Sequence, residues 1–156
     1  MDTRLWNIPL ILKRMLEIMM ALGAVFIVAL PFMTAMMSEH IINEYFTGAS
    51  NDKWLSFVFL ELVALCCWFI LFFLQKLLKT VIESSPFVQQ NVLYLKYTSY
   101  VCAAAALVLI GKTIADFTVL TPVVAVLAVL ASLFCQTLAA VFDKAVRLKD
   151  ENDLTI

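Results

Sequence analysis

Four long apolar stretches, separated by short polar segments, dominate the pattern of hydrophobic and polar positions along the chain. They cover about residues 15–37, 54–74, 92–115 and 119–142. Each holds roughly the 20 residues that a helix needs to cross the hydrocarbon of a bilayer. Because lipid cannot hydrogen-bond an open sheet edge, apolar stretches of this length are predicted to be helices. The pattern therefore predicts an all-α membrane protein, a single four-transmembrane-helix bundle with short loops, followed by a tail at residues 143–156.

Composition places the chain in the same class. Hydrophobic residues make up 63% of it and charged residues 15%, and the mean hydropathy is +0.96. Soluble domains average about 45–50% apolar and about 25% charged residues. We therefore expect membrane lipid to surround the chain. The formal net charge of −1 provides no strongly basic surface, so direct binding of nucleic acid is not expected.

Lysines and arginines are distributed unequally between the two ends of the apolar stretches. Nine lie on the side shared by the two chain termini and the 76–91 loop, and two lie on the other side. The nine are Arg4, Lys13, Arg14, Lys76, Lys79, Lys96, Lys144, Arg147 and Lys149, and the two are Lys53 and Lys112. Segments rich in Lys and Arg stay in the cytoplasm. Both termini and the 76–91 loop are therefore predicted to be cytoplasmic.

Small side chains form a stripe along the fourth apolar stretch. Its members, spaced alternately three and four residues apart, are Ala125, Ala128, Ser132, Cys135 and Ala139. Helices in lipid associate through close van der Waals contact, which small residues permit. The stripe therefore predicts a packing seam with a neighbouring helix rather than a ligand site. The run of small residues at 102–106 in the third stretch is the expected partner.

Glu61 is an acidic residue inside the second apolar stretch. It lies roughly 10 Å from the external end of that stretch, at about 1.5 Å per residue. A charged and unpaired carboxylate at that depth costs a few kcal/mol, so it needs a cation, a proton or a polar neighbour. Lys112, at the outer end of the third stretch, is the expected cation. Two interpretations stay open: a structural carboxyl group that joins two helices, or a proton or cation site.

Other residue types with possible chemistry are few. Cys66, Cys67, Cys102 and Cys135 all lie inside apolar stretches, so we interpret them as reduced packing residues. His40 is the single histidine, and no Cys or His spacing matches a zinc site. The sequence contains no phosphate-binding glycine loop and no nucleophile beside a base. We therefore expect no metal, no cofactor and no enzymatic activity.

Two helix ends are predicted on the cytoplasmic side. Ser85 can cap a helix and Pro86 suits its first position, so an unbroken helix is expected to lead from Pro86 into the third apolar stretch. Phe142 and Val146 share a helical face, so the fourth helix is expected to emerge into the cytoplasm as an amphipathic turn or two. The acidic run at 150–153 is expected to break it.

The chain end VFDKAVRLKDENDLTI, the stretch SSPFVQQNVLYLKYTSY and the four-span layout resemble a family of small bacterial membrane proteins. The family is known as domain of unknown function 2975, also called YoaS-like. Its pattern is carried here by Pro86, Phe87, Asn91 and Leu95, and by acidic Asp153 before the final Leu-Thr-Ile. The resemblance implies a bacterial cytoplasmic membrane. It also implies a neighbour, because genes of this family commonly lie beside a gene for a small helix-turn-helix regulator of the Xre type.

That neighbourhood leads to the hypothesis that the protein docks such a DNA-binding regulator on its cytoplasmic face. The expected contact residues are Phe142, Arg147, Asp150, Glu151, Asp153, Leu154, Thr155, Ile156, Pro86, Phe87 and Asn91. An extended tip can add a strand to a partner's sheet, and an acidic run complements a basic DNA-binding surface. Two alternatives stay open. One is a small transporter or immunity-type protein that uses Glu61, and the other is a structural subunit of a membrane assembly, a homo-oligomer among them.

Overall fold

The computed structural model describes residues 3–36, 53–83, 88–115 and 120–153. Nearly all of these residues form four helices, which are α1 (Thr3–Met36), α3 (Lys53–Glu83), α4 (Gln89–Ala115) and α5 (Leu120–Asp153). Each helix is long and apolar enough to cross a membrane. The prediction of an all-α chain with four membrane-spanning helices is therefore confirmed.

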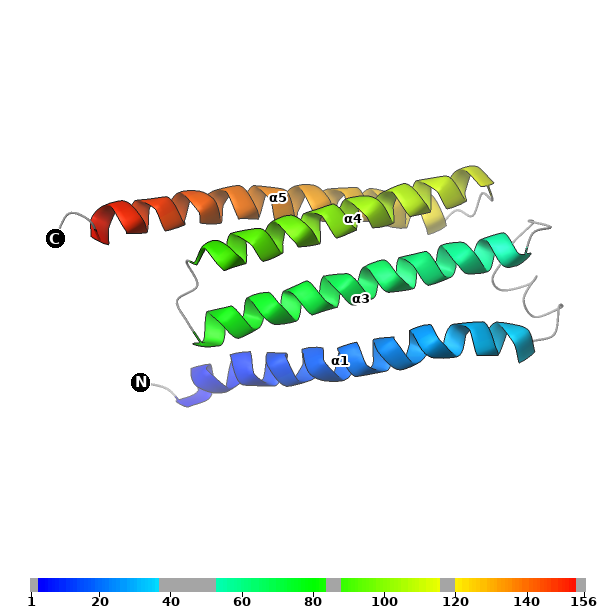
Figure 1. The fold of residues 1–156 in the computed structure, drawn as a ribbon, viewed down its shortest axis with the longest axis horizontal. Coiled ribbons are helices and arrows are strands. Elements are labelled where there is room, and N and C mark those ends of the chain that lie inside the picture. The colour runs from blue at the N-terminus through cyan, green and yellow to red at the C-terminus, as the bar shows by residue number, and fades with distance from the viewer. Residues whose placement is uncertain (1–2, 37–52, 84–87, 116–119, 154–156) are drawn as a thin grey trace.

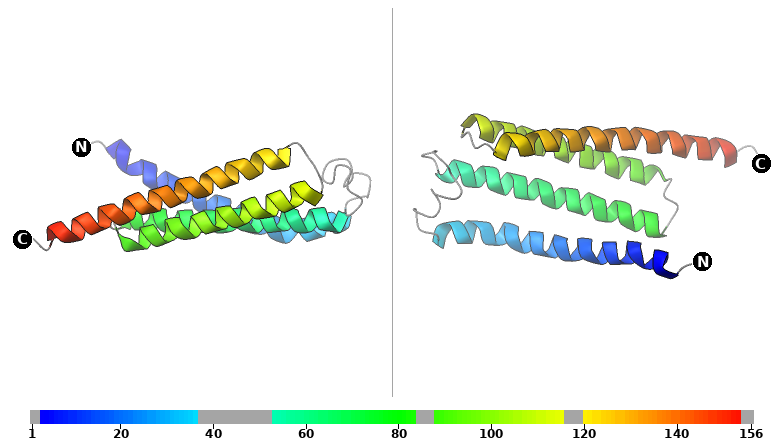
Figure 2. Two further views of the ribbon diagram at one scale, coloured as in Figure 1. Left: turned by 90° about the horizontal axis from the view of Figure 1, so that it is seen from above. Right: turned by 180° about the vertical axis from the view of Figure 1, so that it is seen from behind.

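The four helices lie in a row, in the order α1, α3, α4, α5, and each runs antiparallel to the next (Figure 1). The extensive contacts join successive helices, and they are largest between α4 and α5 and smallest between α1 and α3. Figure 2 shows that α1 crosses the other helices at an angle, so that its first turns lie apart from them. Along the direction of the helix axes, the first turn of α1 and the last turn of α5 lie at the same end of the bundle (Figure 1). The side of the membrane on which this end lies stays a prediction.

The seam between α4 and α5 has the periodicity of a coiled coil. The buried residues of α4 are Asn91, Val92, Leu95, Thr98, Ser99, Cys102, Ala105, Ala106 and Leu109. All nine recur at intervals of seven residues, which is two turns of about 3.5 residues each. On α5, buried Ala139 follows buried Ala125 by fourteen residues, and buried Val146 follows Ala139 by seven. The two helices therefore keep one face toward each other along most of their length.

Contacts between α3 and α4 keep one register along both helices. The rings of Phe73 and Tyr97 stack with their centroids 5.6 Å apart. Farther along, a Cβ atom built on Gly111 would lie 3.6 Å from the ring of Phe59. The two contacts are separated by the same number of residues on each helix, roughly four turns, so the pair stays aligned over about 20 Å. The aromatic rings of α3 thus pack along a fixed line of α4.

The first two helices meet at a tryptophan. The indole Nε1–H of Trp68 in α3 donates a hydrogen bond to the backbone carbonyl oxygen of Met20 in α1, with an N–O distance of 3.2 Å. Gly23, one turn farther along α1, lies so close to Trp68 that a Cβ atom there would be 3.3 Å from the indole Cδ1. An indole N–H in lipid needs an acceptor, and the carbonyl of Met20 supplies it. The absence of a side chain at Gly23 is what allows this close approach.

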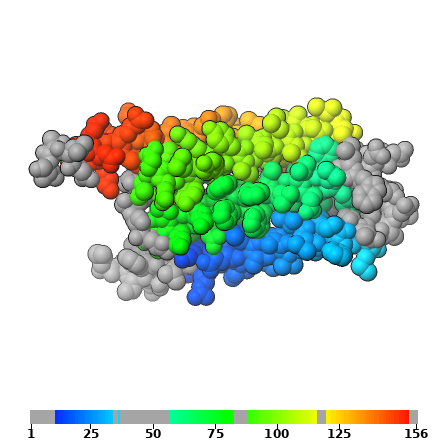
Figure 3. All heavy atoms as spheres, in the orientation of Figure 1, coloured from blue at the N-terminus to red at the C-terminus, as the bar shows by residue number. Residues whose placement is uncertain are grey.

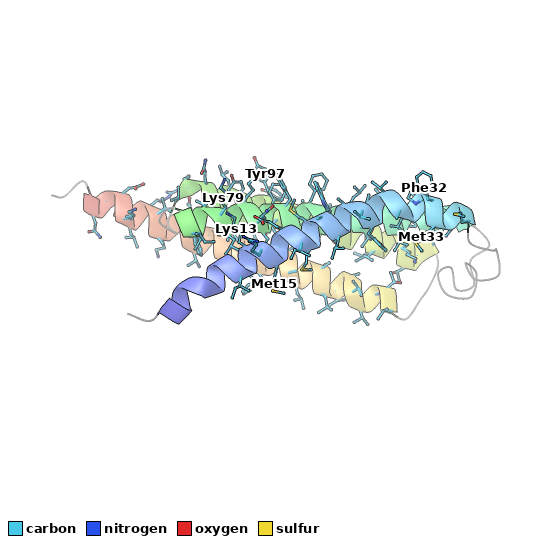
Figure 4. The ribbon with its side chains drawn as sticks, turned by 90° about the horizontal axis from the view of Figure 1, so that it is seen from below. Lys13, Met15, Phe32, Met33, Lys79 and Tyr97 are labelled. Atoms are coloured by element: carbon cyan, nitrogen blue, oxygen red, sulfur yellow. The ribbon has the colours of Figure 1, made fainter. Side chains whose placement is uncertain are left out.

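Apolar side chains cover much of the outer surface, as lipid requires. Side chains fill the spaces between neighbouring helices (Figure 3), yet α1 buries few of its apolar residues. Met15, Phe32 and Met33 of α1 are exposed. In Figure 4, Phe32 and Met33 lie toward one end of the bundle, and Lys13 and Lys79 lie toward the other. Lys13 and Lys79 thus lie toward the end that the sequence assigns to the cytoplasm.

Two predicted helix ends are wrong. Val88 lies outside α4, which begins at Gln89, so the helix is not continuous with Pro86. The backbone N–H of Asn91 bonds the carbonyl of Val88 at 2.9 Å, which closes the first turn. Asn91 and the next residue are both fully buried, so burial against the neighbouring helices, and not the local preference of a proline, sets where α4 begins. Ser85, Pro86 and Phe87 lie outside the described residues.

The acidic run at 150–153 does not break α5, which continues through it to Asp153. Residues 143–156 contain no glycine and no proline, so no residue of that segment forces the helix to end. Carboxylates near a helix C-terminus oppose the helix dipole by only about 0.3–1 kcal/mol each when they are exposed, and salt screens the effect. The unfavourable charge is therefore too weak to stop the helix.

Candidate functional site

Most of the predicted docking residues lie at one end of the helix bundle. At this end the C-terminal part of α5 extends beyond the start of α4. Gln89, the first residue of α4, donates a hydrogen bond from Nε2 to Oδ1 of Asp143 in α5, at 3.3 Å. The helix then continues from Lys144 to Asp153, a further length of about 15 Å at 1.5 Å per residue. Figure 1 shows the end of α5 projecting past the start of α4. We call Lys144–Asp153 the α5 extension.

The base of the α5 extension is fixed by packing. Val146 is buried in an apolar cluster that α4 and α5 share, and Phe142 packs against that cluster. Asp143 Oδ2 also forms an ion pair with Arg147 one turn later, at 3.2 Å. The Arg147 side chain is 75% exposed, and such pairs contribute only about 0.3–0.5 kcal/mol. The apolar contacts therefore determine the direction of the extension, and the ion pair adds little.

Beyond this base the extension is open to its surroundings. Its exposed residues include Arg147, Leu148, Lys149, Asp150 and Glu151. Asp153 is the last helical residue. Leu154, Thr155 and Ile156 lie outside the described residues, as do Pro86 and Phe87. The structure thus places five of the predicted contact residues on α5, namely Phe142, Arg147, Asp150, Glu151 and Asp153.

Asn91 does not belong to an exposed docking surface. Its relative exposure is 0%, and Val92 beside it is equally buried. The Asn91 side chain is therefore not accessible to a docking partner in this structure, and its contact with a partner stays a prediction. Its burial gives it a place in the helix interface instead, next to the turn that begins α4.

Glu61 and Lys112 are both half-buried, and no ion pair joins them among the described residues. The register between α3 and α4 explains why. Phe59 faces Gly111 across the interface. Glu61 is two residues beyond Phe59, about 200° around its helix, and Lys112 is one residue beyond Gly111, about 100° around its own. The two side chains therefore leave the shared line of contact in different directions.

The small-residue stripe of α5 lies along α4. Ala125 and Ala139 are buried, and Ala128, Ser132 and Cys135 are half-buried. Ser132 hydrogen-bonds with Ser99 of α4, through their hydroxyl groups and backbone carbonyls. The stripe is therefore occupied by a neighbouring helix of the same chain.

Sequence reasoning missed a polar pocket on one side of this seam. The pocket has a volume of about 230 Å³ and is lined by Lys96, Ser99, Tyr100, Gln136, Ala140 and Asp143. One signal was present in the sequence. Pro122, Val129, Gln136 and Asp143 recur every seven residues, so they share one side of α5 at 3.5 residues per turn. We call this pocket the polar pocket.

The described residues also include side chains that can bind metals or react through sulfur. No group of three His, Cys, Asp or Glu side chains there is placed to hold a metal ion. Cys66, Cys67, Cys102 and Cys135 are free thiols. The expectation that the protein has no metal, no cofactor and no enzymatic activity stays a prediction from the sequence.

Comparison with protein families matched residues 39–156 to the family described as "Protein of unknown function (DUF2975)". Comparison with curated proteins gave no match, and comparison with solved structures gave none either. The family match covers well over half of the chain and includes the second, third and fourth spans together with the α5 extension. The chain belongs to the DUF2975 family.

Proposed function

We propose that the protein is a docking protein of the bacterial cytoplasmic membrane. It would hold a small helix-turn-helix transcription regulator of the Xre type through its C-terminal tail and the 76–91 loop. The observation that supports this proposal is the α5 extension, which is anchored at its base and exposed beyond it. The extension carries its exposed residues about 15 Å past the start of α4, where a soluble partner can reach them.

The exposed residues of the extension have the chemistry of a helical docking peptide. Asp150 and Glu151 carry negative charge, which complements the basic surface that a DNA-binding domain presents. Leu148 is 54% exposed, although it lies next to charged residues, so it offers an apolar contact to a groove. A helix that is already formed loses less conformational entropy on binding than a disordered tail does.

The same surface explains how docking would regulate transcription. A regulator that binds the acidic extension through its DNA-binding face cannot bind an operator at the same time. Because the extension continues α5, any change in the packing of α5 against α4 moves the docking surface as a rigid body. The cluster around Val146 is the point where such a change would be transmitted.

The test is capture of a small Xre-type regulator of the kind that genes of this family commonly have as a neighbour. Full-length protein and a variant lacking residues 150–156 would be immobilised in mild detergent, and the bound regulator would be quantified. The proposal expects the deletion to reduce capture at least tenfold. Glu17→Gln is the control, because it removes one exposed charge from α1, outside the tail and the 76–91 loop, and it should capture normally. Equal capture by the deletion variant and the full-length protein would overturn the proposal.

The row of helices favours one further candidate function, a structural subunit of a membrane assembly. Only Leu16 and Leu30 are buried among the apolar side chains described in α1, so the outer face of α1 has room for a partner helix. This candidate expects a second copy or a fixed membrane partner to co-purify in mild detergent at constant stoichiometry. A transport function that uses Glu61 with Lys112 gains no such support, because the two side chains are not joined.

A further inference from the structure

The polar pocket lies at the depth of lipid headgroups. Lys96 and Ala115, the last residue of α4, are separated by nineteen positions, or about 28 Å at 1.5 Å per residue. The hydrocarbon core is about 30 Å thick, so Lys96 reaches one boundary when Ala115 lies at the other. Tyr100, one turn deeper, is 62% exposed, and tyrosine is enriched at such boundaries. On the predicted orientation this boundary faces the cytoplasm.

The lining of the polar pocket combines both signs of charge with neutral donors. Lys96 contributes an ammonium group from α4, and Asp143 contributes a carboxylate from α5. Gln136 lies deeper than Asp143, is exposed, and makes no hydrogen bond to the described part of the protein. An amide that faces lipid without a partner costs free energy. A ligand with polar groups at this depth would satisfy it.

An apolar pocket continues the same side of the seam. It has a volume of about 310 Å³, and its lining includes Ile110, Pro122, Val129 and Leu130. Ile110 follows Lys96 by two heptads, and Pro122 precedes Gln136 by two heptads, so both pockets lie on one side of the α4–α5 pair.

The two pockets are also close along the helix axis. Leu130 and Gln136 are six residues apart in α5, about 9 Å along the helix. The acyl chains of one leaflet span roughly 15 Å. One lipid molecule can therefore reach from the polar pocket into the apolar one.

We propose that one phosphatidylethanolamine molecule occupies the polar pocket and the apolar pocket together, and we call the two pockets the lipid groove. Its phosphate would bind Lys96, its ammonium would bind Asp143, and its ester groups would accept a hydrogen bond from Gln136. An acyl chain would lie in the apolar pocket. Asp143 already accepts a bond from Gln89 and pairs with Arg147, but a carboxylate has about four acceptor positions, so room for one more donor remains.

The headgroup follows from the charges. A headgroup with negative charge alone, such as phosphatidylglycerol, would bring no cation to Asp143. Phosphatidylcholine carries a positive charge, but its quaternary ammonium has no N–H to donate. A primary ammonium offers three N–H donors beside the phosphate. The groove should therefore prefer phosphatidylethanolamine to both other lipids.

Native mass spectrometry of the full-length protein would test the proposal. The protein would be equilibrated in mixed micelles that contain phosphatidylethanolamine, phosphatidylglycerol and phosphatidylcholine in equal amounts. The proposal expects one bound phosphatidylethanolamine per chain, at least fivefold above each of the other lipids. Equal occupancy by the three lipids, or a preference for phosphatidylglycerol or phosphatidylcholine, would overturn it.

Variants assign the preference to the groove. Lys96→Gln should reduce bound phospholipid at least fivefold, and Asp143→Asn should abolish the preference over phosphatidylcholine while leaving some binding. Lys144→Gln, an exposed lysine outside the polar pocket, is the matched control and should bind as the parent does. A parent and Lys96→Gln variant with the same bound lipid would contradict the proposal.

A steric variant provides an independent test. Ala140→Leu fills the polar pocket from an exposed position, so it should exclude the lipid without disturbing the seam. Ala131→Leu adds the same volume to α5 at an exposed position outside both pockets and should have no effect. Circular dichroism would verify that both variants keep their helices. Unchanged lipid in a folded Ala140→Leu variant would place the bound lipid elsewhere and overturn the assignment. None of these outcomes depends on whether a regulator docks at the α5 extension.

Discussion

Ser99 and Ser132 join α4 to α5 at the middle of their seam, each within hydrogen-bonding distance of the backbone of the other. The Ser99 hydroxyl donates to the carbonyl oxygen of Ser132 at 3.0 Å, and the Ser132 hydroxyl donates to the carbonyl oxygen of Ser99 at 2.9 Å. Such bonds form only where two helix backbones approach closely, which the small residues around them permit. The threonine hydroxyls of Thr98, Thr113 and Thr137 bond within their own helices instead.

We predict that Ser99→Ala and Ser132→Ala each lower the free energy of unfolding by about 1 kcal/mol, near the upper part of the range for bonds between helices in lipid. The double variant should lose less than the sum, with a coupling of about 0.5 kcal/mol or more. Steric trapping in bicelles would measure all three. Thr137→Ala is the control, because its hydroxyl bonds only its own helix. Strict additivity of the two serine variants would show that the bonds do not act together.

The close contact of Gly23 with Trp68 leads to a second prediction, which concerns the stability of the interface between α1 and α3. A methyl group at Gly23 would lie 3.3 Å from the indole, and Gly23→Leu requires α1 to move away. The overpacked variant should lose about 1–3 kcal/mol of stability and break the bond from Trp68 to Met20. Trp68 fluorescence, in a background with Trp6 and Trp54 replaced by Phe, would shift. Gly111→Ala is the matched control, because its methyl group would meet Phe59 at an ordinary 3.6 Å. A fluorescence spectrum that Gly23→Leu leaves unchanged would argue against this contact.

Orientation can be tested with reporters fused along the chain. The excess of Lys and Arg predicts that the termini and the 76–91 loop are cytoplasmic. Green fluorescent protein fused after Ile156 should therefore fluoresce, and alkaline phosphatase fused there should be inactive. Fusions within residues 38–52 should give the opposite result. Active phosphatase after Ile156 would remove the tail from the reach of any DNA-binding protein.

Charge reversal on the α5 extension should change docking in a salt-dependent way. Asp150→Lys with Glu151→Lys is expected to slow association with the regulator about tenfold at low ionic strength, because complementary charge acts chiefly on the association rate. At about 1 M salt the Debye length falls to about 3 Å, so the difference should largely disappear. Surface plasmon resonance at two salt concentrations would measure the two association rates, with Glu17→Gln on α1 as control. A defect of equal size at both salt concentrations would mean that the substitutions act through something other than charge.

The spans were predictable because length and apolarity alone decide whether a helix crosses lipid. The small-residue stripe was readable for a similar reason, since its spacing places Ala125 through Ala139 on one helix face. The continuation of α5 through residues 150–153 was not predicted, because repulsion between exposed carboxylates and the helix dipole is too weak to end a helix. The start of α4 was misjudged because its buried first turn depends on tertiary contacts.

The candidate sites were harder to predict than the fold. Arg147 and Asn91 were both assigned to the docking surface. In the structure Arg147 is exposed and Asn91 is buried, a difference that the sequence alone does not reveal. Lys112 was paired with Glu61 from depth alone, and depth does not fix the direction in which a side chain leaves its helix. The groove lined by Lys96 and Asp143 was not predicted. The register between α4 and α5 brings these two residues together, and local sequence does not show that register.

The unequal contacts along the row have a consequence for how the chain assembles. The ribosome releases α1 first and α5 last, but α4 and α5 have by far the largest interface and a short connection between them. The hairpin made last should therefore close first within the bilayer, with α3 adding to its side. The first span has the smallest interface with its neighbour, so it should be the last helix to take a fixed position in the bilayer.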